Sequence, residues 1–133
     1  MPDVSREELA KYRIENAEEC LETARFMCEM GKYVVAVNRS YYAIFHAIRA
    51  VFALEGVDRK KHSGVISYFQ QKYIKTGIFD KKFSRVLQDA FEVRQEADYE
   101  DFFVISKQET EEQIENVTEL VMTVQQYVLE KLK

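Results

Sequence analysis

The scarcity of turn-forming residues constrains this fold more than any other feature of the sequence. Proline occurs once and glycine four times in 133 residues. The tight turns of sheet proteins use both residues freely, so their scarcity favours long helices joined by short loops. Gly31, Gly56 and Gly77 each follow a stretch with helical spacing and are the expected helix stops. The sequence therefore predicts an all-α fold.

Apolar residues recur every three or four positions over five stretches, as in amphipathic helices. A Ser-x-x-Glu capping box begins the first and the last of them, and Asp80 is the expected cap of the fourth. The second helix is apolar over most of its circumference and is expected at the centre. Short connections imply an antiparallel helical bundle of about five helices, with residues 1–133 as one domain. The expected helices span about 5–30, 32–55, 61–76, 80–97 and 106–132.

Composition indicates a globular protein with free thiols. Hydrophobic residues make up 47% and charged residues 32% of the chain. No apolar run approaches the ~20 residues of a membrane span, and the charged N-terminus lacks a signal peptide's apolar stretch. We therefore expect a cytoplasmic protein that uses no membrane. Cys20 and Cys28 lie about 12 Å apart along one helix, too far for a disulfide, and are expected to pack in the core. Nothing in the sequence predicts a metal site or a cofactor.

Charge is unevenly distributed along the chain, although the net charge is only −4. Residues 59–85 contain eight Lys or Arg side chains against a single acid, Asp80, whereas residues 96–119 are strongly acidic. Such asymmetry is typical of an anion-facing side or of a docking surface for a partner. Two solvated helix faces would produce the same pattern, so both interpretations stay open.

Polar side chains interrupt the apolar second helix. Arg39 and His46 are seven residues apart and point within about 20° of each other, with Tyr42 between them. Four alanines occupy the neighbouring sector, where small side chains would let another backbone approach and hold Arg39 and His46 in a narrow groove: Ala36, Ala43, Ala47 and Ala50. On spacing alone, Arg39 is equally compatible with a structural ion pair to a carboxylate such as Asp98, and His46 with a satisfied interior histidine.

A family resemblance favours the functional interpretation. The run Arg39-Ser-Tyr-Tyr-Ala-Ile-Phe-His46 resembles the Arg-x(4–6)-His motif of the HEPN family, the higher eukaryotes and prokaryotes nucleotide-binding domains. The segments HSGVISYF and RQEADYEDF, further along, extend the resemblance over residues 38–103. The match is to the small stand-alone archaeal and bacterial branch associated with minimal nucleotidyltransferases.

This resemblance implies a helical bundle that forms a homodimer and cuts RNA without a metal. Arg39 would then hold the scissile phosphate, and His46 would act as general acid or base. The resemblance also implies a partner nucleotidyltransferase, in a toxin–antitoxin pair or as a nucleotide-binding helper. Two positions depart from the family's toxins: Ser40 replaces a larger polar residue, and Ile48 replaces the tyrosine of a His-x-Tyr element.

Other residues are candidates for supporting roles. His62, among lysines at the start of the third helix, would contact a second phosphate, or else be a surface residue beside a cap made by Ser63 or Asp58. Arg94 and Asp98 form an i, i+4 pair that would lock the fourth helix or orient Arg39 and His46.

The acidic segment that follows the fourth helix carries two neighbouring aromatic side chains. Phe102 and Phe103 would form an exposed apolar patch at a subunit interface, or fold back onto the core.

The sequence therefore leaves two functions open. The first is a metal-independent endoribonuclease that works as a homodimer through Arg39 and His46. The second is a non-catalytic module that binds a nucleotide or docks a nucleotidyltransferase through the same groove. Ser40 and the overall acidity, which does not suit tight non-specific RNA binding, favour the second.

Overall fold

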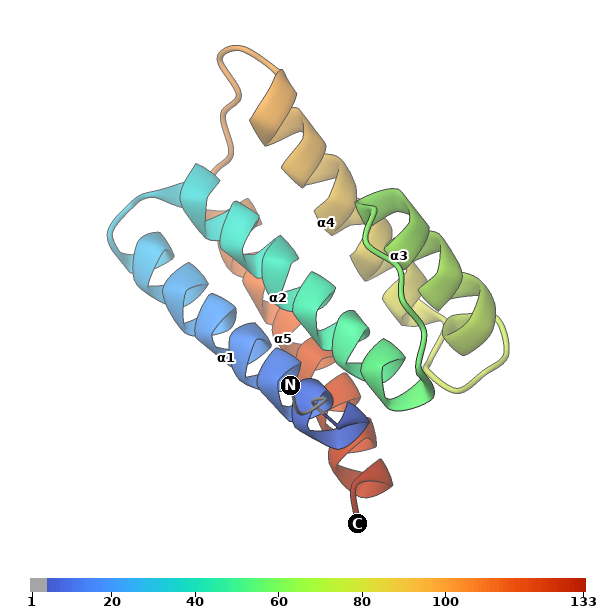
Figure 1. The fold of residues 1–133 in the computed structure, drawn as a ribbon. Coiled ribbons are helices and arrows are strands. Elements are labelled where there is room, and N and C mark those ends of the chain that lie inside the picture. Colours follow the sequence, from blue (N-terminus) through green and yellow to red (C-terminus); the bar gives the residue numbers. More distant parts are fainter. Residues whose placement is uncertain (1–4) are drawn as a thin grey trace.

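The computed structural model describes residues 5–133, and this part of the chain is an all-α bundle without strands. The predicted fold class is confirmed, and the helix bounds differ from the expected ones by a few residues. Residues 1–4, which belong to the predicted domain 1–133 and to its charged N-terminus, lie outside the described residues. The elements are α1 (Arg6–Glu29), α2 (Tyr33–Glu55), α3 (His62–Phe69), the π-helical turn η1 (Gln70–Ile74), α4 (Lys82–Tyr99) and α5 (Lys107–Lys131) (Figure 1).

Local signals place the helix ends much as predicted. Ser106 and Glu109 form a complete capping box, whereas Ser5 only accepts the backbone N–H of Glu8. The carboxylate of Asp80 accepts the backbone N–H of Lys82 at the start of α4. Helix α2 ends at Gly56, whose φ of 70° lies in the left-handed region that glycine adopts without a steric cost.

The predicted third helix is wrong in one respect, because its second half is π-helical. The backbone N–H of Lys75 bonds the carbonyl of Gln70, five residues earlier. This wider turn brings Tyr73 into the core, where its hydroxyl donates to the Glu55 carboxylate at 2.5 Å. The bond ties η1 to the end of α2, a long-range contact that residue periodicity does not encode.

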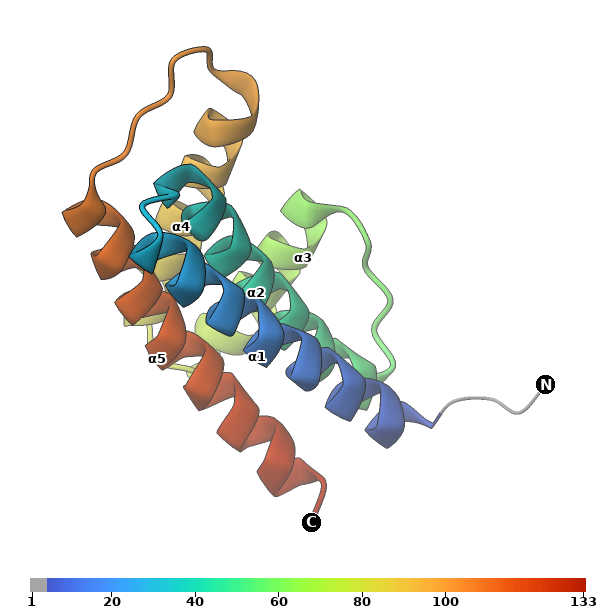
Figure 2. The same ribbon diagram turned by 90° about the vertical axis from the view of Figure 1, so that its left-hand side faces the viewer.

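Helices α1 and α2 form an antiparallel pair (Figures 1 and 2). Alanines recur every seven residues on both helices, and all of them are fully buried: Ala10, Ala17 and Ala24 on α1, and Ala36, Ala43 and Ala50 on α2. The alanines form three pairs, each with its two members equally far from residue 30: Ala24 with Ala36, Ala17 with Ala43, and Ala10 with Ala50. The two series are therefore in register across the hairpin. The backbone that approaches the predicted alanine strip is therefore α1.

Helix α2 lies between two parts of the bundle. Helices α1 and α5 pack on one side of it, and α3 and α4 lie on the other (Figures 1 and 2). Its predicted core residues are fully or almost fully buried: Val37, Tyr41, Ile44, Ile48 and Phe52. Aromatic contacts such as Phe52–Tyr68 and Phe69–Phe79 hold the α3 side. The remaining sector of α2, between α1 and α3, carries its polar residues.

Two further sequence predictions concern thiols and membranes. Cys20 and Cys28 are free thiols, as expected, and Cys28 is buried while Cys20 is half-buried against the core. Within residues 5–133, no helix combines the length and the apolar character that crossing a bilayer requires.

Candidate active site

Four half-buried side chains form a polar stripe along α2: Arg39, Tyr42, His46 and Arg49. Their spacing of three, four and three residues places them on one helix face. The first three are predicted from the sequence above, and Arg49 is not. The signal was present, because Arg49 continues the same spacing one step beyond His46.

The hydrogen-bond acceptor of the Arg39 guanidinium is an uncharged side chain. Its Nε and Nη2 donate to the side-chain oxygen of Asn38 at 3.2 and 2.9 Å, and its guanidinium lies 4.9 Å from the centre of the Tyr42 ring. Among residues 5–133 it forms no ion pair, and Asp98, the suggested structural partner, pairs with Arg94 instead. A neutral amide and an aromatic face orient this guanidinium and leave its charge available to an anion.

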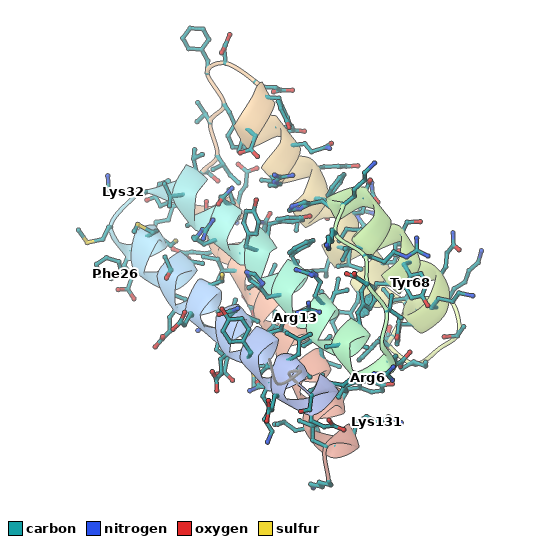
Figure 3. All side chains as sticks on the ribbon, in the orientation of Figure 1. Arg6, Arg13, Phe26, Lys32, Tyr68 and Lys131 are labelled. Carbon is teal, nitrogen blue, oxygen red and sulfur yellow. The ribbon has the colours of Figure 1, made fainter. Side chains whose placement is uncertain are left out.

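His46 lies among cations. Burial lowers the pKa of its imidazole, and the positive charges of Arg49, Arg39 and Arg13 lower it further. Arg13 comes from α1, beside α2 in Figure 3, and its Nη1 donates to the carbonyl of Arg49 at 2.8 Å. The imidazole is therefore neutral near pH 7 and able to accept a proton. A phosphate bound to these arginines would offset their repulsion and raise the pKa of His46 again.

His62, the first residue of α3, contacts aromatic side chains of α2. Its ring stacks on Phe45 with centres 4.3 Å apart, and its Nδ1 lies 2.7 Å from the hydroxyl of Tyr41. Burial raises the pKa of Tyr41, so its hydroxyl keeps its proton near neutral pH. The neutral form of the His62 imidazole forms this bond in either direction, as donor or as acceptor, depending on which ring nitrogen carries the proton.

The surroundings of His62 favour that neutral form. Burial lowers the pKa of the His62 imidazole, followed by the charges of Arg94 and Arg49, against a raising effect of Asp98. Neither Ser63 nor Asp58 caps α3, whose N-cap is Lys61 without a side-chain bond. His62 is thus held against α2. The alternative prediction, a surface residue beside a cap made by Ser63 or Asp58, is wrong.

Arg94 connects α4 to the α2 stripe. Its Nε lies 3.2 Å from a carboxylate oxygen of Asp98, and its Nη2 donates to the Tyr42 hydroxyl at 3.4 Å. The ion pair is not aligned as a hydrogen bond, so the buried Nε lacks a hydrogen-bond acceptor. Its guanidinium also lies 5.4 Å from the centre of the Tyr41 ring. The predicted Arg94–Asp98 pair therefore exists within α4, and the bond from Arg94 to Tyr42 connects α4 to the stripe.

The two departures from the family's toxin pattern have structural roles here. Ser40 is fully buried, donates to the carbonyl of Val37 at 2.8 Å and accepts from Gln113 Nε2 at 2.8 Å. It thereby connects α2 to α5. Ile48 is also fully buried, so its position faces the core and not the stripe.

The loop between α4 and α5 exposes apolar side chains. Phe102 is 98% exposed, Tyr99 79% and Val104 85%, while Phe103 is half-buried. The predicted exposed patch is confirmed for Phe102, and Phe103 folds partly back. Phe102 also has a φ of 59°, unusual for a residue with a side chain. An exposed apolar group on a strained backbone is typical of a contact surface.

The site thus contains two histidines and four arginines from four helices, with Asp98 as the acid beside Arg94. Residues 5–133 hold no group of three or more His, Cys, Asp or Glu side chains placed to share a metal ion.

A family model described as the HEPN domain matches residues 10–127, which includes the whole α2 stripe. The chain belongs to the HEPN family. The resemblance inferred from the motif is thereby confirmed.

Curated relatives of this HEPN chain come from archaea and bacteria. A protein of Methanocaldococcus jannaschii named "Putative toxin" is 36% identical over 106 residues, which cover 80% of this chain and 71% of the relative. A second protein with that name from the same organism is 35% identical over 112 residues, or 84% and 79% of the two chains. A protein of Thermotoga maritima is 34% identical and covers 71% of each chain.

Proposed function

We propose that this HEPN protein is a metal-independent endoribonuclease that acts as a homodimer in the cytoplasm, with a toxin-like role. The observation that carries the proposal is that one face of α2 holds both Arg39, which forms no ion pair within residues 5–133, and His46, which its surroundings keep neutral. The names of the two Methanocaldococcus relatives support the toxin-like role.

The chemistry follows from these two side chains. Neutral His46 accepts the proton of an RNA 2′-hydroxyl, whose oxygen attacks the neighbouring phosphorus while the bond to the 5′-oxygen breaks. Arg39 and Arg49 stabilise the charge that develops on the phosphate oxygens. The leaving 5′-oxygen takes its proton from a protonated imidazole, which the second His46 of the homodimer supplies. The products are a 2′,3′-cyclic phosphate and a 5′-hydroxyl.

The homodimer follows from the proposed chemistry, which needs both a base and an acid. One protomer contributes a single His46 to the stripe. A second copy across the α2 stripe would bring two sets of Arg39 and His46 to one strand, so that one imidazole serves as base and the other as acid. The exposed Phe102 and Val104 provide apolar surface for such a contact.

Cleavage in the presence of EDTA tests the enzyme. Wild-type protein should cut single-stranded or structured RNA, and an Arg39→Ala/His46→Ala variant should be slower by at least about 100-fold. Lys11→Ala, an exposed change elsewhere on α1, should cut like wild type. If the wild type cuts no faster than the double variant, the protein is not a ribonuclease of this kind.

The second candidate is a non-catalytic module that binds a nucleotide or docks a nucleotidyltransferase through the same face. The burial of Ser40, where the family's toxins have a larger polar residue, and the net charge of −4 favour it. Calorimetry with nucleoside triphosphates and co-purification with the product of the neighbouring gene test this alternative. The absence of both heat and partner would eliminate it.

A further inference from the structure

The basic stretch over residues 59–85 provides cations that the α2 stripe does not use. Three of its eight are engaged: Lys82 bonds Glu119 at 2.5 Å, Arg85 lies 3.5 Å from Asp89, and Arg59 covers the Tyr68 ring. The five others are exposed lysines that form no ion pair with any residue in 5–133: Lys60, Lys61, Lys72, Lys75 and Lys81. Such a group is suited to binding a polyanion.

Two of these lysines, Lys75 and Lys81, line a hollow of about 730 Å³ between α3, η1 and α4. Apolar side chains, including Ile66 and Phe91, form part of its lining, and three glutamines add amide groups: Gln70, Gln71 and Gln88. Lysines, amides and an aromatic ring in one open hollow fit a nucleotide. The ammonium groups would contact phosphates, the ring would contact a base, and the amides would bond the base edges.

The π-helical turn holds part of this polar lining. Gln70 begins η1, and its side-chain oxygen accepts the Ser84 hydroxyl of α4 at 2.8 Å. That bond fixes the orientation of the amide and leaves its nitrogen as a donor. Single π-helical turns inside helices are frequent at functional sites. Here the turn places two successive glutamines, Gln70 and Gln71, in the lining.

The hollow adjoins the candidate active site. Ser63, in its lining, directly follows His62. Phe91, also in the lining, has its ring 6.1 Å from that of Tyr41, whose hydroxyl bonds His62. A strand whose phosphate lies on the α2 stripe could therefore pass His62 and enter the hollow. This continuity favours RNA over an acidic segment of a protein partner, which would not need the amides.

We propose that the hollow between α3, η1 and α4 is a subsite for the nucleotide that neighbours the scissile phosphate of single-stranded RNA. Lys75 and Lys81 bind its phosphates, Phe91 contacts its base, and Gln70 and Gln88 bond the base edge. The proposal rests on the proposed ribonuclease function, since that function places a strand on the α2 stripe.

Binding measurements test the lysines. In a His46→Ala background that prevents cleavage, fluorescence anisotropy of a labelled single-stranded RNA dodecamer gives the dissociation constant over a range of salt concentrations. Lys75→Glu/Lys81→Glu should weaken binding at least about tenfold and reduce the salt slope by about 1.4, the value for two lost phosphate contacts. The matched control, Lys11→Glu/Lys32→Glu, changes the net charge equally at exposed positions away from the hollow.

Cleavage patterns test the amides. Gln70→Ala/Gln88→Ala should change the base preference next to the cleaved bond, whereas the Lys11→Glu/Lys32→Glu control should keep the wild-type preference. If the lysine variant binds RNA within twofold of its control, the subsite is refuted and the ribonuclease proposal stands. The same conclusion follows if the lysine variant keeps RNA binding and loses only the binding of an acidic protein. If wild-type protein neither binds nor cuts RNA, both proposals fail.

Discussion

The two sides of helix α2 are built in different ways. Toward α1, fully buried alanines let two backbones approach closely. Toward α3 and α4, aromatic rings separate cations that have few carboxylate partners. Close packing of small residues provides stability and tolerates no added volume. Cations supported by rings and amides provide a surface that gains interactions only when an anion binds.

This difference implies that stability and function can be changed separately. The seam, defined here as the six alanines Ala10, Ala17, Ala24, Ala36, Ala43 and Ala50, should control unfolding. The α2 stripe should control RNA cleavage.

The largest expected effect comes from the stripe. Arg39→Gln should lower RNA cleavage by about 100- to 1000-fold, because it removes a charge that stabilises the transition state. Its unfolding free energy should change by less than about 0.5 kcal/mol, since within residues 5–133 the guanidinium contacts side chains of its own helix, Asn38 and Tyr42. Initial rates in EDTA and urea unfolding measure the two quantities, with Lys11→Gln at an exposed position of α1 as the control. A large loss of stability would mean that Arg39 is structural.

The seam should respond in the opposite way. Ala43→Leu adds volume where α1 and α2 are in contact and should lower the unfolding free energy by about 1–3 kcal/mol. Cleavage by the protein that remains folded should stay near wild type. Ala97→Leu on α4, where the side chain is only half-buried, is the matched control and should cost less. Equal losses for the two variants would show that the seam is not tightly packed.

The charge of the stripe should be visible in pH dependence. Burial and the neighbouring arginines lower the pKa of His46, and burial and Arg94 lower that of His62. As pH falls below 6.5, both histidines bind protons more readily in the unfolded chain than in the folded protein, where their pKa values are lower. The unfolding free energy should therefore decrease. Urea unfolding between pH 7.5 and 6 should show this slope, and His46→Gln/His62→Gln should flatten it.

Arg49→Gln isolates one cause of that shift. Removing this charge should raise the pKa of His46, which NMR titration of the imidazole measures directly. Because the base must be unprotonated to act, the acid limb of the cleavage profile should move to higher pH. An unchanged profile would mean that His46 does not provide the base.

The smallest expected effect lies in the loop between α4 and α5. Phe102→Asn should raise the unfolding free energy by about 1 kcal/mol, because asparagine adopts a positive φ more readily and an exposed ring contributes no packing. It should also weaken self-association, measured by sedimentation velocity. Phe103→Asn, at a half-buried position, should instead lower stability. A Phe102 variant that associates like wild type would place the subunit contact elsewhere.

Helices and helix ends were predictable because their signals are local. Backbone bonds within a helix join residues four apart, so apolar spacing, capping serines and glycine stops are encoded in short stretches. The alignment of Arg39 with His46 follows from the same period, and so does that of Arg49, which was overlooked. The alanine strip was also visible, although the sequence did not say which helix would cover it.

The sequence by itself determined the all-α class, the helix ends and the single face of α2 that carries Arg39 and His46. Only the tertiary structure decided that α1 covers the alanines, that Arg13 and Arg94 join the stripe, and that His62 bonds Tyr41 from 21 residues away. The π-helical turn and the hollow beside it belong to the same category. These features depend on how separate helices pack against one another, which the spacing of residues within one helix does not encode.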